Sequence, residues 1–226
     1  MFQNREEAAE DLALKIKDLL QSQFGQISRK SILVLAIPRG GVIVGDIVAS
    51  KLGCGLDIIV SRKVGAPWNP ELAIGAVMPD GTYYYNEKVM ANFQDISKQY
   101  IDDSILMQKK EIDRRLLEFR GKMDSTLEQN EYQVVVLVDD GIATGSTMIA
   151  AARWLREKQK YEHLIIAVPV APRSKETTTE LEQAADKLII LHSPEIFHAV
   201  GQFYTDFSQI SDNDVRKIMQ KHRYSS

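Results

Sequence analysis

The chain of 226 residues is long enough for one domain, and its 44% hydrophobic and 26% charged residues are typical of a soluble globular protein. Its net charge of −3 argues against a protein whose main role is to coat nucleic acid. No apolar run reaches the length of a membrane span, and the polar, acidic N-terminus is unlike a signal peptide. Because the single cysteine, Cys54, cannot form an internal disulfide, we expect a reducing, cytoplasmic location.

The first part of the chain predicts a helix, a strand and a second helix. An amphipathic helix is expected over Asn4–Leu20 and a buried strand over Ser31–Ile37. This strand leads into Pro38-Arg39-Gly40-Gly41 and then into a helix that Gly53 closes. Glycines between a strand and a helix expose backbone amides to an anion, and Arg39 adds a positive charge. The segment therefore predicts a candidate phosphate loop, although glycines that only shape a turn would give the same pattern.

A second strand is expected over Leu56–Val60, and the basic pair Arg62-Lys63 follows it. The pair is either a solvated strand end or a contact for an anion at the same edge of the sheet. Residues Gly65–Glu87 are irregular, but Pro79-Asp80-Gly81 lies between two β-prone segments and predicts a hairpin. A long amphipathic helix over Asp95–Arg120 comes next.

The most informative stretch is Val134–Thr147, which reads VVVLVDDGIATGST. Its apolar run predicts a strand buried on both faces, and two acids, Asp139 and Asp140, follow at once. Glycines and hydroxyl residues then lead into a helix, whose free N-terminal amides suit a phosphate. Adjacent carboxylates would repel a phosphate and suit the vicinal hydroxyls of a sugar. The stretch predicts a ribose 5-phosphate site, with an ordinary acid-capped helix as the alternative.

The last third of the chain continues the alternation. Strands are expected over Leu164–Val170 and Lys187–Leu191, with a helix over Lys175–Ala185 between them. Strands joined through helices imply a parallel sheet with right-handed connections. The tail then combines aromatic and polar residues, and the rings of Phe203 and Tyr204 could either stack on a heterocycle or pack at the domain edge.

The stretch around the two acids resembles the phosphoribosyl pyrophosphate (PRPP) motif of type I phosphoribosyltransferases: an apolar strand, two acids, two variable residues and then A/T-T-G-x-S/T. The resemblance implies an α/β, Rossmann-type fold with a roughly five-stranded parallel sheet, a flap hairpin and a small hood. A single domain would span residues 1–226, with the flap at about 64–94 and the hood formed by the N-terminal helix and about 194–226. In this family the loop that corresponds to PRGG commonly contains a non-proline cis peptide.

The resemblance also implies an activity, namely Mg²⁺-dependent transfer of the phosphoribosyl group from PRPP to a nitrogenous acceptor, with release of pyrophosphate, in a homodimer. Mg²⁺ would be held mainly by PRPP, with Asp139 or Asp140 as a ligand through water. The implied catalytic residues are Asp139, Asp140 and Lys63, and the candidates for the acceptor site are Trp68, Phe203 and Tyr204. The implied PRPP-binding residues are Arg39, Gly40, Gly41, Arg62, Lys63, Asp139, Asp140, Ala143, Thr144, Gly145, Ser146 and Thr147.

The resemblance leaves the acceptor open. Ala143 stands where hypoxanthine-guanine enzymes carry an Asp, so a 6-oxopurine is less expected. The rest of the chain is most similar to a bacterial group of unassigned acceptor. Two other classes of function stay open: a regulatory protein that binds PRPP or a nucleotide, and a hydrolase or phosphorylase that acts on ribose phosphates.

Overall fold

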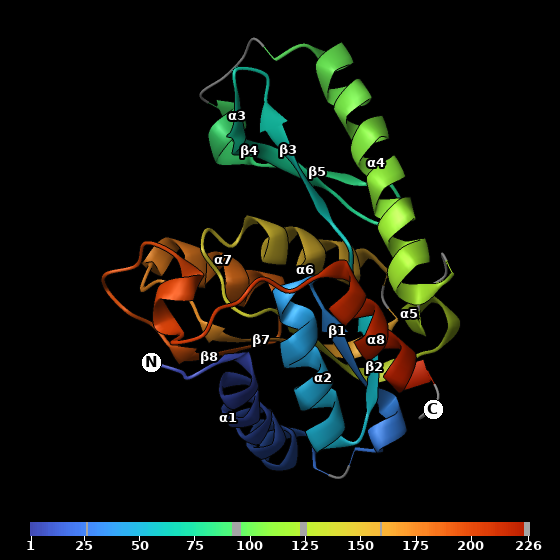
Figure 1. Cartoon of the computed structure of the whole chain (residues 1–226), viewed down its shortest axis with the longest axis vertical. Helices are drawn as coiled ribbons and strands as arrows, with labels where there is room; N and C mark the ends of the chain where they lie inside the picture. Colours follow the sequence, from blue (N-terminus) through green and yellow to red (C-terminus); the bar gives the residue numbers. More distant parts are fainter. Residues whose placement is uncertain (26, 92–95, 123–125, 159, 224–226) are drawn as a thin grey trace.

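The computed structural model describes residues 1–25, 27–91, 96–122, 126–158 and 160–223 (Figure 1). Within these ranges, five strands form a parallel sheet in the order β2-β1-β6-β7-β8, and three strands form a small antiparallel sheet, β3-β4-β5. The predicted parallel sheet and flap hairpin are thereby confirmed. Residues 92–94 of the predicted flap, residue 95 of the predicted long helix and residues 224–226 of the predicted hood lie outside the described residues.

The elements have the following bounds. The parallel strands are β1 (Ile32–Ala36), β2 (Gly55–Ile58), β6 (Tyr132–Val138), β7 (Tyr161–Val170) and β8 (Lys187–His192). The antiparallel strands are β3 (Arg62–Ala66), β4 (Asn69–Val77) and β5 (Tyr83–Tyr85). The α-helices are α1 (Arg5–Leu19), α2 (Gly40–Leu52), α3 (Glu87–Ala91), α4 (Lys98–Arg120), α5 (Thr126–Gln129), α6 (Ser146–Lys158), α7 (Lys175–Ala184) and α8 (Asp212–Arg223).

Helices cover both faces of the parallel sheet, which explains why its central strands are apolar throughout. Successive side chains of a strand point to opposite faces. Val34 and Val136 therefore pack toward α1 and α2, whereas Leu35 and Leu137 pack toward α6 and α7. Figure 1 shows these helix pairs on opposite sides of the sheet. Strands buried on both faces are characteristic of parallel α/β sheets.

The register of the parallel sheet brings the two predicted loops together. Ala36 at the end of β1 is paired with Val138 at the end of β6, and also with Ile58 of β2. The segment Pro38–Gly41 and the acids that follow Val138 consequently leave the sheet side by side. The carboxyl edge of the strands is where open α/β sheets bind their ligands.

The small sheet starts earlier than expected. The pair Arg62-Lys63 opens β3, opposite Val77 and Ala76 of β4, and does not end the preceding parallel strand. The prediction that the pair stands at the end of the second parallel strand is therefore wrong, because the pair begins a strand of the small sheet. The Ile59 amide still donates to the Ala36 carbonyl of β1 at 3.0 Å, and from Arg62 onward the chain pairs with the hairpin strand β4.

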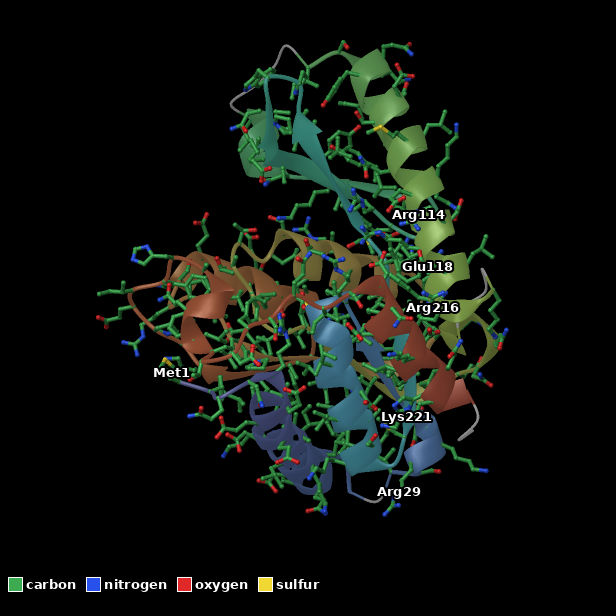
Figure 2. The ribbon with its side chains drawn as sticks, in the orientation of Figure 1. Met1, Arg29, Arg114, Glu118, Arg216 and Lys221 are labelled. Carbon is green, nitrogen blue, oxygen red and sulfur yellow. The ribbon has the colours of Figure 1, made fainter. Side chains whose placement is uncertain are left out.

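Helix α4 packs against the small antiparallel sheet. It begins where Ser97 Oγ accepts a hydrogen bond from the Tyr100 amide, and it ends at Gly121, whose φ of 66° suits glycine. The Tyr100 hydroxyl donates to the Gly65 carbonyl of β3 at 2.8 Å, which joins helix and sheet. The outer face of α4 carries ion pairs such as Arg114 with Glu118, 2.6 Å apart (Figure 2).

The two terminal segments meet at the β8 side of the molecule. Phe2 forms a parallel bridge with Tyr204, and its amide donates to the Phe203 carbonyl at 2.8 Å. Helix α8 lies elsewhere and packs against α2, α4 and β2 (Figure 1). The predicted hood is thus divided, because the amphipathic face of α8 covers the opposite edge of the sheet. Within the described residues, no helix combines the length and apolar character needed to cross a membrane.

Candidate active site

The two predicted loops are in contact at the acid pair. A Cβ added to Gly40 would lie 1.8 Å from Asp140 Oδ2, and one added to Gly41 would lie 2.9 Å from the Asp139 Cα. No side chain fits at either position without displacing the acids. The structure therefore brings Gly40, Gly41, Asp139 and Asp140 together. The sequence suggested glycine here because it exposes amide donors, and the structure adds that a larger residue would collide with the acids.

Two helix N-termini lie at this edge of the sheet. Helix α2 begins at Gly40 and α6 begins at Ser146, and the first amides of a helix lack intrahelical partners. Gly145, just before α6, has a φ of 81°, which strongly favours glycine. The Thr144 and Ser146 hydroxyls are 3.3 Å apart, and Ala143 and Thr144 are exposed. This loop offers amides and hydroxyls to an anion.

The peptide bond between Pro38 and Arg39 is cis, as the family resemblance led us to expect. The Arg39 guanidinium is 3.4 Å from an Asp212 carboxylate oxygen at the start of α8, and both side chains are about one third exposed. An ion pair of this length and exposure contributes little stability. The Arg39 guanidinium is consequently held only weakly by α8.

Burial raises the pKa of the Asp139 carboxyl well above its usual range, and the neighbouring Asp140 carboxylate raises it further. A hydrogen bond from the Asp140 amide to Asp139 Oδ1, at 2.8 Å, partly opposes this rise. Two close carboxylates therefore carry their negative charge at an energetic cost. A ligand that donates hydrogen bonds to them, or that brings positive charge, would stabilise the ionised form.

Arg5 is a site residue that the sequence prediction missed. Its side chain is buried, and its Nε lies 2.7 Å from Asp140 Oδ2. One local signal was present: Arg5 is a cation in the first turn of α1, beside Glu6 and Glu7, where the helix dipole favours acids. That mismatch indicates a partner outside the helix but does not identify it.

The two basic residues of β3 point in different directions. Arg62 Nε donates to Gln108 Oε1 of α4 at 3.0 Å, so Arg62 faces the helix that carries the small sheet. The contact of Arg62 with a ligand stays a prediction, and in this conformation its side chain is hydrogen-bonded to α4. Strand alternation turns the exposed Lys63 to the opposite face, away from α4.

The aromatic candidates for the acceptor site are separated by the fold. Phe203 and Tyr204 are 9% and 5% exposed and belong to a small apolar cluster of the terminal segments. The Tyr204 ring stacks on Phe207, with centroids 5.0 Å apart, and its hydroxyl donates to the Asp140 carbonyl at 2.6 Å. Phe203 and Tyr204 are therefore not open to stack on a heterocycle, because protein groups already cover their rings. Trp68, between β3 and β4, is 53% exposed.

A cleft of about 250 Å³ lies between the hairpin and helices α6 and α7. Its walls combine small or apolar residues of β4 and α6 with polar side chains. The polar and aromatic lining residues are Tyr84, Tyr85, Asn86, Ser146, Arg153, Glu180 and Gln183. Ser146 lines this cleft and is also the first residue of α6. The cleft therefore adjoins the carboxyl edge of the parallel sheet, where the acid pair lies.

The residues present could bind Mg²⁺ only together with a phosphate-containing ligand that supplies further oxygen atoms. Among the described residues, no group of three or more His, Cys, Asp or Glu side chains is placed to hold a metal ion. Mg²⁺ in phosphate-binding sites is commonly held by one or two carboxylates together with phosphate oxygens and water. Asp139 and Asp140 supply that kind of donor set.

The fold and the candidate site define an open α/β sheet protein whose loops gather an acid pair and two helix N-termini at the carboxyl edge. Comparison with known proteins gives the family. Residues 6–208 match the model of the phosphoribosyl transferase domain. The chain belongs to this family.

Two relatives illustrate the similarity. A Mycobacterium tuberculosis (strain H37Rv) protein, whose name assigns it provisionally to the phosphoribosyl transferases, is 35% identical over 224 residues, which are 99% of this chain and 47% of the relative. This chain thus spans about half the length of that relative. The crystal structure of TT1426 from Thermus thermophilus is 33% identical, with a TM-score of 0.76 over 97% of this chain and 98% of that chain.

Proposed function

We propose that this chain transfers the phosphoribosyl group of PRPP to a nitrogenous acceptor, with Mg²⁺ and with release of pyrophosphate. The observation that supports this proposal is the contact between the Gly40–Gly41 loop and the acids Asp139 and Asp140. This contact places backbone amides that can donate hydrogen bonds to an anion beside carboxylates that can accept hydrogen bonds from hydroxyl groups. Such a combination matches a sugar that carries phosphate groups at two positions. Family membership supports the same chemistry.

In this proposal each loop binds one part of PRPP. The amides and hydroxyls of Ala143–Thr147 take the 5-phosphate at the N-terminus of α6. The carboxylates of Asp139 and Asp140 accept hydrogen bonds from the ribose hydroxyls. The amides of Gly40 and Gly41, with Arg39, take the pyrophosphate. Lys63 would approach the pyrophosphate from the hairpin.

The transfer forms a bond from the acceptor nitrogen to C1 of the ribose and breaks the bond from C1 to the pyrophosphate oxygen. Positive charge develops on the ribose ring in the transition state, and the fixed negative charge of Asp139 and Asp140 stabilises it. Mg²⁺, bound chiefly to the pyrophosphate, would neutralise part of the charge on the leaving group. The hairpin above the site would keep water from competing with the acceptor.

For the acceptor we propose the cleft between the hairpin and α6, with Trp68 as a further contact on the hairpin. Arg153 and Asn86 offer donors, and Glu180 offers an acceptor, which suits a heterocycle with mixed ring nitrogen and carbonyl groups. Replacing Arg153 with Gln should raise the KM for the acceptor while leaving PRPP affinity unchanged. An equal loss of PRPP affinity would place Arg153 outside the acceptor site.

The proposed function is tested first by calorimetry of PRPP binding, with and without Mg²⁺. Binding that depends on Mg²⁺ and weakens in Asp139→Asn is the expected result. A panel of nucleobases and related heterocycles is then screened for pyrophosphate release. Absence of PRPP binding would refute the proposal, and release of ribose 5-phosphate without any base would favour the hydrolase alternative.

A further inference from the structure

Arg5 is fixed on three sides. Besides the contact of its Nε with Asp140 Oδ2, its Nη1 donates to the Ser208 carbonyl at 2.9 Å. Its guanidinium carbon lies 3.7 Å from the centre of the Phe207 ring, within the range of a cation–π contact. A side chain with an ion pair, a backbone hydrogen bond and an aromatic contact has little freedom to turn away from Asp140.

The groups that hold Arg5 also hold Asp140. Phe207, which covers the guanidinium, stacks on Tyr204, and the Tyr204 hydroxyl donates to the Asp140 carbonyl at 2.6 Å. The segment that carries Tyr204 is joined to the N-terminus by hydrogen bonds of 2.9 Å from the Thr205 amide to the Phe2 carbonyl and 2.8 Å from the Asp206 amide to the Gln3 carbonyl. The N-terminal segment and residues 204–208 therefore converge on one residue of the acid pair.

A purely structural ion pair is a weak explanation for Arg5. The chain has such a pair elsewhere: Arg120 Nε lies 2.7 Å from Asp57 Oδ1, and the same oxygen accepts a hydrogen bond from the Ile58 amide. That pair ties helix α4 to strand β2, and strand β1 lies between β2 and the strand that carries the acid pair. Arg5 instead occupies a helix turn that disfavours a cation, and its partner is the second acid of the motif.

We propose that Arg5 is a positioning residue for phosphoribosyl transfer, and that the terminal segments act on the reaction through it. This inference rests on the proposed function. The guanidinium engages Oδ2 of Asp140 and orients the carboxylate, so that Oδ1 is presented to a ribose hydroxyl. Arg5 itself touches neither PRPP nor the acceptor.

The test is a double-mutant cycle on the full chain, with the dissociation constant of PRPP in the presence of Mg²⁺ as the readout. The four proteins are the wild type, Arg5→Gln, Asp140→Asn and the double variant. Because Arg5 acts through Asp140, Arg5→Gln should weaken binding about ten-fold in the wild-type background and less than about two-fold in the Asp140→Asn background. Arg5→Lys should recover only part of the affinity, since an ammonium group lacks the guanidinium fork.

Arg120→Gln is the matched control, because it breaks a buried arginine–aspartate pair of the same length that includes neither acid of the motif. It should lower the melting temperature without changing PRPP affinity. If Arg5→Gln does not fold, the partial loss in Arg5→Lys carries the test. Equal effects of Arg5→Gln in both backgrounds, or unchanged PRPP affinity in the Arg5 variants, would overturn the positioning role while leaving the proposed function intact. Absence of PRPP binding by the wild type would overturn both.

Discussion

Gly40 lies so close to the side chain of Asp140 that even a methyl group at Gly40 would collide with Oδ2, at 1.8 Å. This contact links the loop after β1 to the acid pair after β6. It makes the geometry of the acids depend on a residue of the neighbouring strand's loop, and that dependence can be measured.

Gly40→Ala should weaken PRPP binding by at least about ten-fold, because the new methyl group must displace the Asp140 carboxylate, and overpacking of this kind costs about 1–3 kcal/mol. Calorimetry and thermal melting measure the two effects. Gly55→Ala is the control, since its Cβ would meet the Leu33 side chain at an ordinary 3.4 Å. Unchanged affinity in Gly40→Ala would show that the acids tolerate displacement.

The raised pKa of Asp139 predicts how stability depends on pH. Because burial raises the pKa in the folded state, the folded protein binds the proton more tightly than the unfolded chain. Stability from this group is therefore greatest at low pH and falls as pH rises from the unfolded pKa of about 3.9 toward the higher folded pKa.

Asp139→Asn lacks this ionisation, so it should raise the melting temperature relative to the wild type at about pH 8 and less so at about pH 5. It should also weaken PRPP binding, since an amide is a poorer acceptor for ribose hydroxyls. Melting curves across this range measure the difference. A variant less stable than the wild type at the higher pH would contradict the expected penalty for the buried charge.

The buried pair of Asp57 and Arg120 predicts a large loss of stability without loss of function. Arg120→Met leaves the Asp57 carboxylate, which is 1% exposed, without its guanidinium partner, and breaking a buried pair from one side costs about 3–5 kcal/mol. Urea unfolding measures this cost. Arg114→Gln removes exposed pairs on α4 and should cost at most about 1 kcal/mol (Figure 2). Similar costs for the two variants would contradict the assignment.

The opposite directions of Arg62 and Lys63 predict different phenotypes. Lys63→Ala should lower kcat/KM for pyrophosphate release about ten-fold or more, because the positive charge that we propose beside the leaving group is lost. Arg62→Ala should instead loosen the hairpin from α4 and lower the melting temperature, because it removes the hydrogen bond to Gln108. A larger kinetic effect from Arg62→Ala would imply that the hairpin rotates when PRPP binds.

Much of the site could be predicted from local sequence. The strand, the acids and the glycine–hydroxyl loop of Val134–Thr147 lie within one continuous stretch, and their chemistry depends on spacing along the chain. The alternation of buried strands with helices was likewise sufficient to predict the parallel sheet, because strands joined by helices have few arrangements available.

Tertiary structure decided the rest. Arg5 and Asp140 are 135 positions apart, and only the packing of the two terminal segments brings their side chains together. The same packing covers Phe203 and Tyr204, whose sequence suited a ligand surface equally well. The direction of the Arg62 side chain depends on where the chain passes from the parallel sheet into β3. Because successive side chains of a strand point to opposite faces, a shift of one residue would exchange the faces of Arg62 and Lys63. The spacing of residues along Val134–Thr147 was enough to identify the motif. Contacts between distant parts of the chain determined which residues surround and position it.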